Sequence, residues 1–135
     1  MYHMMSRLAL KTSLIAALLT MAAGLSSGSA AASELVMFER DGCVWCARWN
    51  REIAPSYDKT DEAKVLPLRR INMDRDKAPG FTLASPVRFT PTFVIVDDGH
   101  EIGRITGYMN DESFWGLLGK YAARLTTSQP NANRS

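Results

Sequence analysis

The sequence predicts an α/β fold in which helices flank a central mixed β-sheet. An apolar run at 35–38, a helical pattern at 43–54 and a strand pattern at 65–73 follow one another in the order of a parallel β-α-β unit. A hairpin pattern at 93–106 adds two strands that run antiparallel to each other. Parallel and antiparallel pairs within one domain make the expected sheet mixed.

The first helix follows directly from the first strand. Residues 35–38 are all apolar, as in a buried strand, and Asp41-Gly42 favours a turn after them. We expect a helix from about Cys43 to about Ala54, which Pro55 helps to end. Its apolar residues recur at helical spacing and predict a face packed on the sheet: Cys46, Trp49 and Ile53.

The middle of the chain is less regular. The strand pattern at 65–73 contains Pro67, which favours an edge or irregular position because proline cannot donate a ladder hydrogen bond. Residues 74–86 are polar and are interrupted by Pro79-Gly80, so we expect a loop with one helical turn at 81–84. The hairpin follows, and its turn is expected at Asp97-Asp98-Gly99-His100.

The last helix completes the expected domain, which covers residues 33–125. Asp111 or Ser113 can cap a helix that runs to about Arg124. Its predicted buried stripe consists of Phe114, Leu117, Leu118 and Tyr121. Residues 126–135 contain few apolar side chains and predict a disordered tail.

Residues 1–32 have the three parts of a secretory signal peptide. Two basic residues precede an uncharged stretch at 14–25, and small residues then run up to Ala32. We expect cleavage after Ala32, or slightly earlier after Ala30, and therefore export. The apolar stretch is short for a membrane span, which needs roughly 20 residues. The pattern therefore favours a cleaved signal peptide over an uncleaved membrane anchor.

The charge of the chain excludes one class of partner. The whole chain has 16 Lys+Arg and 14 Asp+Glu, and its leader carries two basic residues and no acidic one. The exported chain would therefore hold 14 of each. Without net positive charge there is no electrostatic reason to expect a nucleic acid or an anionic membrane as the partner.

The only two cysteines form the motif Cys43-Val44-Trp45-Cys46. The thiolate is the reactive form of cysteine, and a helix start stabilises negative charge through its free N–H groups and dipole. Cys43 is therefore the predicted nucleophile, and Cys46, one turn later, can resolve a mixed disulfide on Cys43. The alternative is a structural disulfide, but so short a loop makes a weak crosslink.

A second motif, Phe89-Thr90-Pro91-Thr92-Phe93, brings a proline into an apolar strand, which is poorly tolerated unless that position has another role. A Cys-x-x-Cys after the first strand and a Thr-Pro before a later strand resemble the thioredoxin superfamily. The resemblance implies a thioredoxin-like fold and thiol-disulfide oxidoreductase activity without a small-molecule cofactor. It also implies that Pro91 is cis beside the disulfide and that the backbone of Thr90 binds the partner.

Three stretches, at 87–93, 103–108 and 114–118, are similar to the periplasmic SoxS-like thioredoxins of bacterial sulfur-oxidation operons. This resemblance implies a monomeric periplasmic protein. Its implied partner is a protein with a reactive cysteine or disulfide, such as a sulfur-carrier protein that the enzyme keeps in its working form. Electrons would come from a membrane thiol reductant.

The chain departs from thioredoxins at one acidic position. Thioredoxins usually carry a buried acidic residue six positions before the first cysteine, where this chain has Met37. Glu39 is close to that position in the sequence, and we hypothesise that it replaces the missing acidic residue as the proton acceptor for Cys46. The dipeptide between the cysteines also differs from the Gly-Pro of thioredoxin, so the direction of electron flow stays open.

Two kinds of surface residue have alternative interpretations. Trp45 is a candidate substrate-binding residue that contacts an incoming chain, or it packs against Trp49 one turn later. Arg40, Arg48 and Arg51 form a basic collar for an acidic partner, or they are ordinary solvated charges.

Three other functions are alternatives to the reduction of a sulfur-carrier protein. A Cys-x-x-Cys pair can bind copper or contribute half of a zinc site, although only His100 follows the leader and no metal site is predicted. The protein could instead be a general periplasmic disulfide reductase or oxidase. A redox-inert adaptor that keeps the fold is the third alternative.

Overall fold

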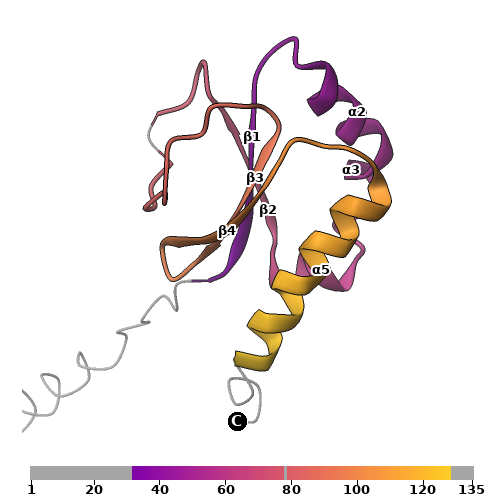
Figure 1. Cartoon of the computed structure of the whole chain (residues 1–135), viewed down its shortest axis with the longest axis vertical. Helices are drawn as coiled ribbons and strands as arrows, with labels where there is room; N and C mark the ends of the chain where they lie inside the picture. The colour runs from indigo at the N-terminus through magenta and orange to yellow at the C-terminus, as the bar shows by residue number, and fades with distance from the viewer. Residues whose placement is uncertain (1–31, 78, 129–135) are drawn as a thin grey trace, which may run out of the picture.

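The computed structural model describes residues 32–77 and 79–128, and these form one sheet with helices packed against it (Figure 1). The elements in chain order are β1 (Glu34–Glu39), α2 (Val44–Glu52), α3 (Ala54–Tyr57), α4 (Asp61–Val65), β2 (Leu68–Asn72), β3 (Thr92–Asp97), β4 (His100–Thr106) and α5 (Asp111–Ser128).

The sheet is mixed, with strand order β2-β1-β3-β4. β1 pairs in parallel with β2 and antiparallel with β3, while β3 pairs antiparallel with β4. The end of β1 lies beside the start of β3, because Phe38 is opposite Thr92. The predicted fold class, a central mixed sheet with flanking helices, is confirmed.

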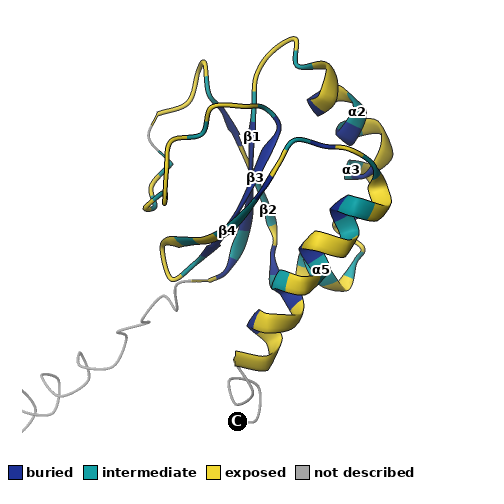
Figure 2. Ribbon diagram, viewed as in Figure 1, coloured by how far each residue is buried: buried dark blue, intermediate teal, exposed yellow. Residues whose placement is uncertain are grey.

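The two faces of the sheet are covered differently (Figures 1 and 2). One face carries Leu35 and Met37 and packs against the helices, where the predicted face of α2 is buried as expected. The other face carries Val36 and Phe38 and is covered by the long segment between β2 and β3, which places apolar side chains on it: Met73, Phe81, Leu83 and Val87. Because both faces are covered, β1 is a continuous apolar run.

The hairpin between β3 and β4 turns where the sequence predicts. Asp98 and Gly99 both have positive φ, 49° and 73°. A two-residue hairpin turn whose twist matches that of the strands requires positive φ at both of its central residues. Pro67 precedes the edge strand β2, and its carbonyl accepts a hydrogen bond from the Leu35 N–H at 3.0 Å. The edge position expected for this part of the chain is confirmed.

The helix predicted from 43 to 54 is confirmed over residues 44–52, but it ends two residues earlier than expected. α2 ends at Glu52, and α3 begins at Ala54 with Pro55 in its first turn, a place where its missing N–H costs nothing. The strand predicted from residue 65 begins only at Leu68. Residues 61–65 form α4 instead, capped by the hydroxyl of Thr60, which accepts a hydrogen bond from the Ala63 N–H at 3.2 Å.

The helical turn predicted at 81–84 is also wrong. This segment is extended, and the Thr82 N–H donates to the Gly99 carbonyl while the Thr82 carbonyl accepts from the Glu101 N–H, both at 2.9 Å. A long-range contact with the hairpin therefore determines its conformation, which local sequence patterns do not reveal.

The last helix, α5, is longer than predicted and buries a different stripe. It continues to Ser128, so three residues of the predicted tail are helical, each with its hydroxyl bonded to the carbonyl four residues earlier: Thr126, Thr127 and Ser128. Leu117 is 44% exposed and does not belong to the stripe. The buried residues of α5 are Phe114, Leu118, Ala122 and Leu125.

Two predicted segments fall largely outside the described residues. The predicted signal peptide (1–32) lies outside the described residues except for Ala32, and so does the tail from residue 129. Within residues 32–77 and 79–128, none of the helices has the length and apolar character to span a bilayer.

Candidate active site

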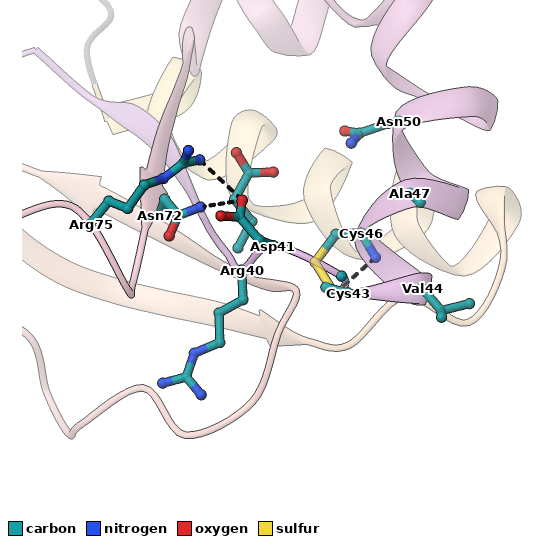
Figure 3. A pocket seen from close by; sticks show the side chains of 11 residues that line it. Arg40, Asp41, Cys43, Val44, Cys46, Ala47, Asn50, Asn72 and Arg75 are labelled. Atoms are coloured by element: carbon teal, nitrogen blue, oxygen red, sulfur yellow. Dashed lines mark hydrogen bonds and ion pairs between the residues drawn. A yellow bond between two sulfur atoms is a disulfide. The ribbon is translucent and has the colours of Figure 1, made fainter.

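The two cysteines lie where β1 turns into α2 (Figure 3). Gly42 has a positive φ of 73°, which suits glycine in the turn that leads into the helix. Cys43 is the N-cap residue of α2, and its Sγ accepts a hydrogen bond from the Cys46 N–H at 3.1 Å. The two side chains form a disulfide with a Cα–Cα distance of 5.2 Å. A free N–H at the helix start is thus directed at the first sulfur.

The two cysteines differ in exposure. Cys46 is 3% exposed and belongs to the core that contains Trp49, whereas Cys43 is half-buried. The next residue, Val44, is 73% exposed. Of the two cysteines, Cys43 is therefore the more accessible to an approaching protein.

Pro91 lies at the same edge of the sheet as the disulfide, because β3 starts beside the end of β1. The Thr90–Pro91 peptide bond is cis, and Pro91 is buried. The Pro91 carbonyl accepts a hydrogen bond from the Gly107 N–H at 2.7 Å. Within the described part of the chain, the backbone N–H and carbonyl of Thr90 have no backbone partner.

Trp45 and Trp49 occupy different environments. Trp45 is 53% exposed, and the guanidinium carbon of Arg48 lies 5.9 Å from its ring centroid. Trp49 is fully buried, with its ring centroid 5.2 Å from that of Phe93. Trp49 is therefore a core residue, and Trp45 presents an open aromatic surface two positions after Cys43.

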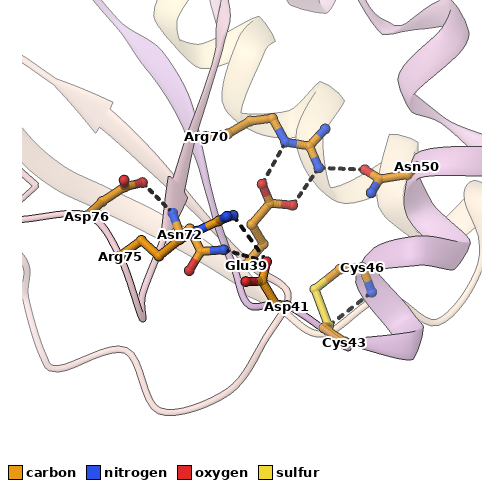
Figure 4. A network of polar contacts seen from close by, with 9 residues as sticks. All are labelled: Glu39, Asp41, Cys43, Cys46, Asn50, Arg70, Asn72, Arg75 and Asp76. Carbon is orange, nitrogen blue, oxygen red and sulfur yellow. Dashed lines mark hydrogen bonds and ion pairs between the residues drawn. A yellow bond between two sulfur atoms is a disulfide. The ribbon is translucent and has the colours of Figure 1, made fainter.

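A polar pocket of about 390 Å³ adjoins the disulfide, and its lining includes Cys43, Cys46 and Glu39 (Figure 3). The Glu39 carboxylate pairs with Arg70 of β2 through two hydrogen bonds, and Arg70 also donates to the Asn50 side chain at 2.6 Å (Figure 4). Glu39 follows Met37 on the same strand by two positions, so both point toward the helical face of the sheet.

Asp41, which also lines this pocket, makes a second group of contacts (Figure 4). Asp41 accepts hydrogen bonds from Asn72 at 3.0 Å and from Arg75 at 3.1 Å. These contacts connect the turn before Cys43 to the end of β2 and the residues that follow it.

In residues 32–77 and 79–128, His, Cys, Asp and Glu side chains nowhere gather in a group of three or more that could hold a metal ion.

Comparison with known proteins agrees with this geometry. The family described as the thioredoxin-like domain matches residues 28–122. The chain belongs to the thioredoxin-like family. Among solved structures, it is similar to the reduced form of the periplasmic thioredoxin SoxS from Paracoccus pantotrophus, with 44% identity and a TM-score of 0.64 over 68% of this chain and 97% of that one.

Two more distant structures support the thioredoxin-like fold alone. A thioredoxin from Malassezia sympodialis has 14% identity and a TM-score of 0.55, over 68% of this chain and 79% of that chain. A thioredoxin from Thermus thermophilus has 16% identity and a TM-score of 0.52, over 76% and 84%. No curated protein gives a significant sequence match.

This thioredoxin-like protein is a thiol-disulfide oxidoreductase that carries a Cys43–Cys46 pair, and its substrates are proteins with thiols or disulfides.

Sequence reasoning missed the side chains that support the site from a distance. Tyr108 donates a hydrogen bond to Glu52 at 2.6 Å, and Glu101 binds Arg104. Only the second pair has a sequence signal, opposite charges three residues apart.

Proposed function

We propose that this protein is a periplasmic enzyme that reduces disulfides or modified thiols on a sulfur-carrier partner protein. The observation that carries the proposal is the Cys43 sulfur, which caps α2 and lies half-exposed above the buried Cys46. The similarity to a periplasmic thioredoxin SoxS supports the choice of compartment and partner class. Residues 1–32 act in this proposal as a cleaved signal peptide, and residues 33–125 act as a monomeric domain.

In the proposed reaction, Cys43 is the nucleophile and Cys46 is the resolving cysteine. The Cys43 thiolate attacks one sulfur of the partner's disulfide, and the partner's other sulfur leaves as a thiolate. The Cys46 thiolate then attacks Cys43 in the mixed disulfide and releases the partner's second thiolate. Two electrons pass to the partner, and the enzyme is left with the Cys43–Cys46 disulfide. A membrane thiol reductant restores the dithiol by the same exchange.

Three further residues are proposed to bind the substrate chain. The unpaired backbone groups of Thr90 can form strand-like hydrogen bonds with an extended segment of the partner. Pro91 is proposed to keep the Thr90 backbone in position for that segment, because Pro91 is buried and its carbonyl accepts a hydrogen bond from the Gly107 N–H. Trp45 offers an exposed ring for apolar contact beside Cys43.

Glu39 is the proposed proton acceptor for Cys46. It lines the pocket that Cys46 also lines, and it takes the helical face of the sheet that Met37 occupies two residues earlier. Its pairing with Arg70 keeps the carboxylate in a fixed position. A Glu39→Gln variant that resolves the mixed disulfide at the wild-type rate across pH would remove this role.

The test is to trap partners with Cys46→Ser, expressed with the native leader. This variant can attack but cannot release, so partners should remain bound to Cys43 as reducible adducts. Recovery of a sulfur-carrier protein would support the proposal, while other partners would favour general disulfide reduction or oxidation. The matched control is Cys43→Ser, which should trap nothing because Cys46 is buried.

A folded and exported Cys46→Ser protein that forms no adduct would contradict the exchange mechanism. Metal binding by the cysteine pair would then be the next function to measure.

A further inference from the structure

A second pocket, of about 360 Å³, lies between α2 and the segment that follows β4. Its lining residues are Trp45, Arg48, Thr106, Gly107, Tyr108 and Met109. Trp45 is two residues from Cys43, and Gly107 holds the carbonyl of Pro91. The pocket therefore adjoins the place where the reacting segment of a substrate would lie.

Arg48 is held in one orientation at this pocket. Its Nε donates to Glu52 at 2.9 Å, and its Nη1 donates to the Met109 carbonyl at 3.2 Å. Glu52 is itself fixed by the Tyr108 hydroxyl, which donates to its other oxygen at 2.6 Å. A side chain that is already ordered loses little conformational entropy when it binds a ligand.

The Arg48 guanidinium keeps donors for a further acceptor. Its carbon lies 5.9 Å from the ring centroid of Trp45 and 5.7 Å from that of Tyr108. A guanidinium has five N–H groups, all in its plane, and the described contacts use only two of them. The remaining N–H groups have the fork geometry that a carboxylate matches.

The charge of the pocket also favours an acidic ligand. Arg48 is the only charged residue among those that line it. Two carboxylates outside the lining, Glu52 and Asp111, act on the guanidinium, but Glu52 binds it through Nε, and the Met109 carbonyl takes only one N–H of Nη1, so Nη2 and the second N–H of Nη1 stay available. Exposed apolar surface from Trp45 and Met109 suits the aliphatic part of a glutamate side chain.

We propose that Arg48 is a specificity-determining residue that binds an acidic side chain close to the reactive cysteine of the protein substrate. This inference rests on the proposed thiol-disulfide exchange at Cys43. The preference arises because the fixed guanidinium attracts a carboxylate that an uncharged amide of the same shape cannot replace.

The experiment compares two disulfide-linked peptide dimers that differ only in the residues beside the cysteine, Glu in one and Gln in the other. The reduced enzyme should reduce the Glu peptide about fivefold faster at low salt, the upper range for an exposed ion pair. The ratio of the two rates should fall as salt is added.

Variants assign the preference to one arginine. In Arg48→Gln the ratio of the two rates should fall to about one, and Arg48→Lys should keep part of it because the charge remains without the fork. Arg51→Gln is the matched control, an exposed arginine of α2 that does not line the pocket, and it should keep the wild-type ratio.

Two results would overturn the inference. One is a wild-type ratio near one, and another is a wild-type ratio that survives in Arg48→Gln. If Arg48 only supports the segment at 107–109, its loss lowers both rates by the same factor and leaves the ratio intact. Equal reduction of both peptides leaves the exchange mechanism standing, whereas no reduction of either peptide overturns both proposals.

Discussion

The ion pair between Glu101 and Arg104 of β4 should be important for stability, because it is largely buried. The side chains are 4% and 22% exposed, respectively. Glu101 also accepts a hydrogen bond from the Ala84 N–H, and Arg104 donates to the Ser85 carbonyl, both at 2.7 Å. The pair thereby fixes the segment that leads to Thr90 and Pro91.

We expect Glu101→Gln to lower the free energy of unfolding by about 2 kcal/mol. Exposed ion pairs contribute about 0–1 kcal/mol, while breaking a buried pair costs about 3–5 kcal/mol. This pair is more buried than exposed, which favours the upper range. Glutamine keeps an oxygen that can accept from Ala84, which reduces the loss.

The effect should depend on pH. The hydrogen bond from Arg104 is the main reason why the pKa of Glu101 lies below its usual value. A carboxyl group with a lowered folded pKa contributes its full stability above the pKa of the unfolded chain, about 4.3, and loses it as the pH falls through the folded value. The difference between wild type and Glu101→Gln should therefore shrink in acid.

Urea denaturation at pH 7 and at decreasing pH measures both effects. Asp61→Asn is the matched control, since Asp61 pairs with Lys64 at the same spacing of three residues but both side chains are largely exposed. It should leave the unfolding midpoint nearly unchanged. Equal losses in the two variants, or a Glu101→Gln difference that persists in acid, would refute the reasoning from burial.

Two pairs of variants test the other features of the fold by urea denaturation. Leu118→Ala should cost about 3 kcal/mol because Leu118 is fully buried, while Leu117→Ala, at a 44% exposed position, should cost less than about 1 kcal/mol. Gly42→Ala should cost about 1 kcal/mol because its φ is +73°, whereas Gly116→Ala, in α5 with open space around it, should gain about 0.5–1 kcal/mol. Equal losses in unfolding free energy for Leu118→Ala and Leu117→Ala would contradict the assigned buried face of α5. Equal losses for Gly42→Ala and Gly116→Ala would contradict the assigned need for positive φ at Gly42.

The elements that the sequence predicts well are those with strong local signals. The apolar run of β1 is long enough to identify a strand buried on both faces. Asp98-Gly99 identifies the hairpin because both positions require positive φ. The spacing of Cys46, Trp49 and Ile53 identifies the buried face of α2, and the same residues pack in the core.

The errors fall where local signals are short or are overridden. α3 and α4 have only four and five residues, too few to show an amphipathic stripe. Thr60 followed by Asp61 and Glu62 is nevertheless a helix-start signal that could have revealed α4. The segment around Thr82 is extended because the hairpin pairs with it from far along the chain, and its own composition does not encode that contact.

The candidate site shows the same limit for side chains. The motif around Cys43 can be recognised from spacing alone, but the three arginines of the predicted collar look equivalent in the sequence. In the structure they differ: Arg40 pairs with Asp74, Arg48 is fixed between two aromatic rings, and Arg51 makes no ion pair among the described residues. Therefore the three arginines are neither all part of a collar for an acidic partner nor all ordinary solvated charges. Arg40 lines the pocket beside the disulfide but pairs with Asp74, whereas Arg48 lines the second pocket, where its hydrogen bond to the Met109 carbonyl joins α2 to the segment after β4. The interpretation of each arginine as a binding residue or a solvated charge therefore depends on long-range contacts that the sequence does not show.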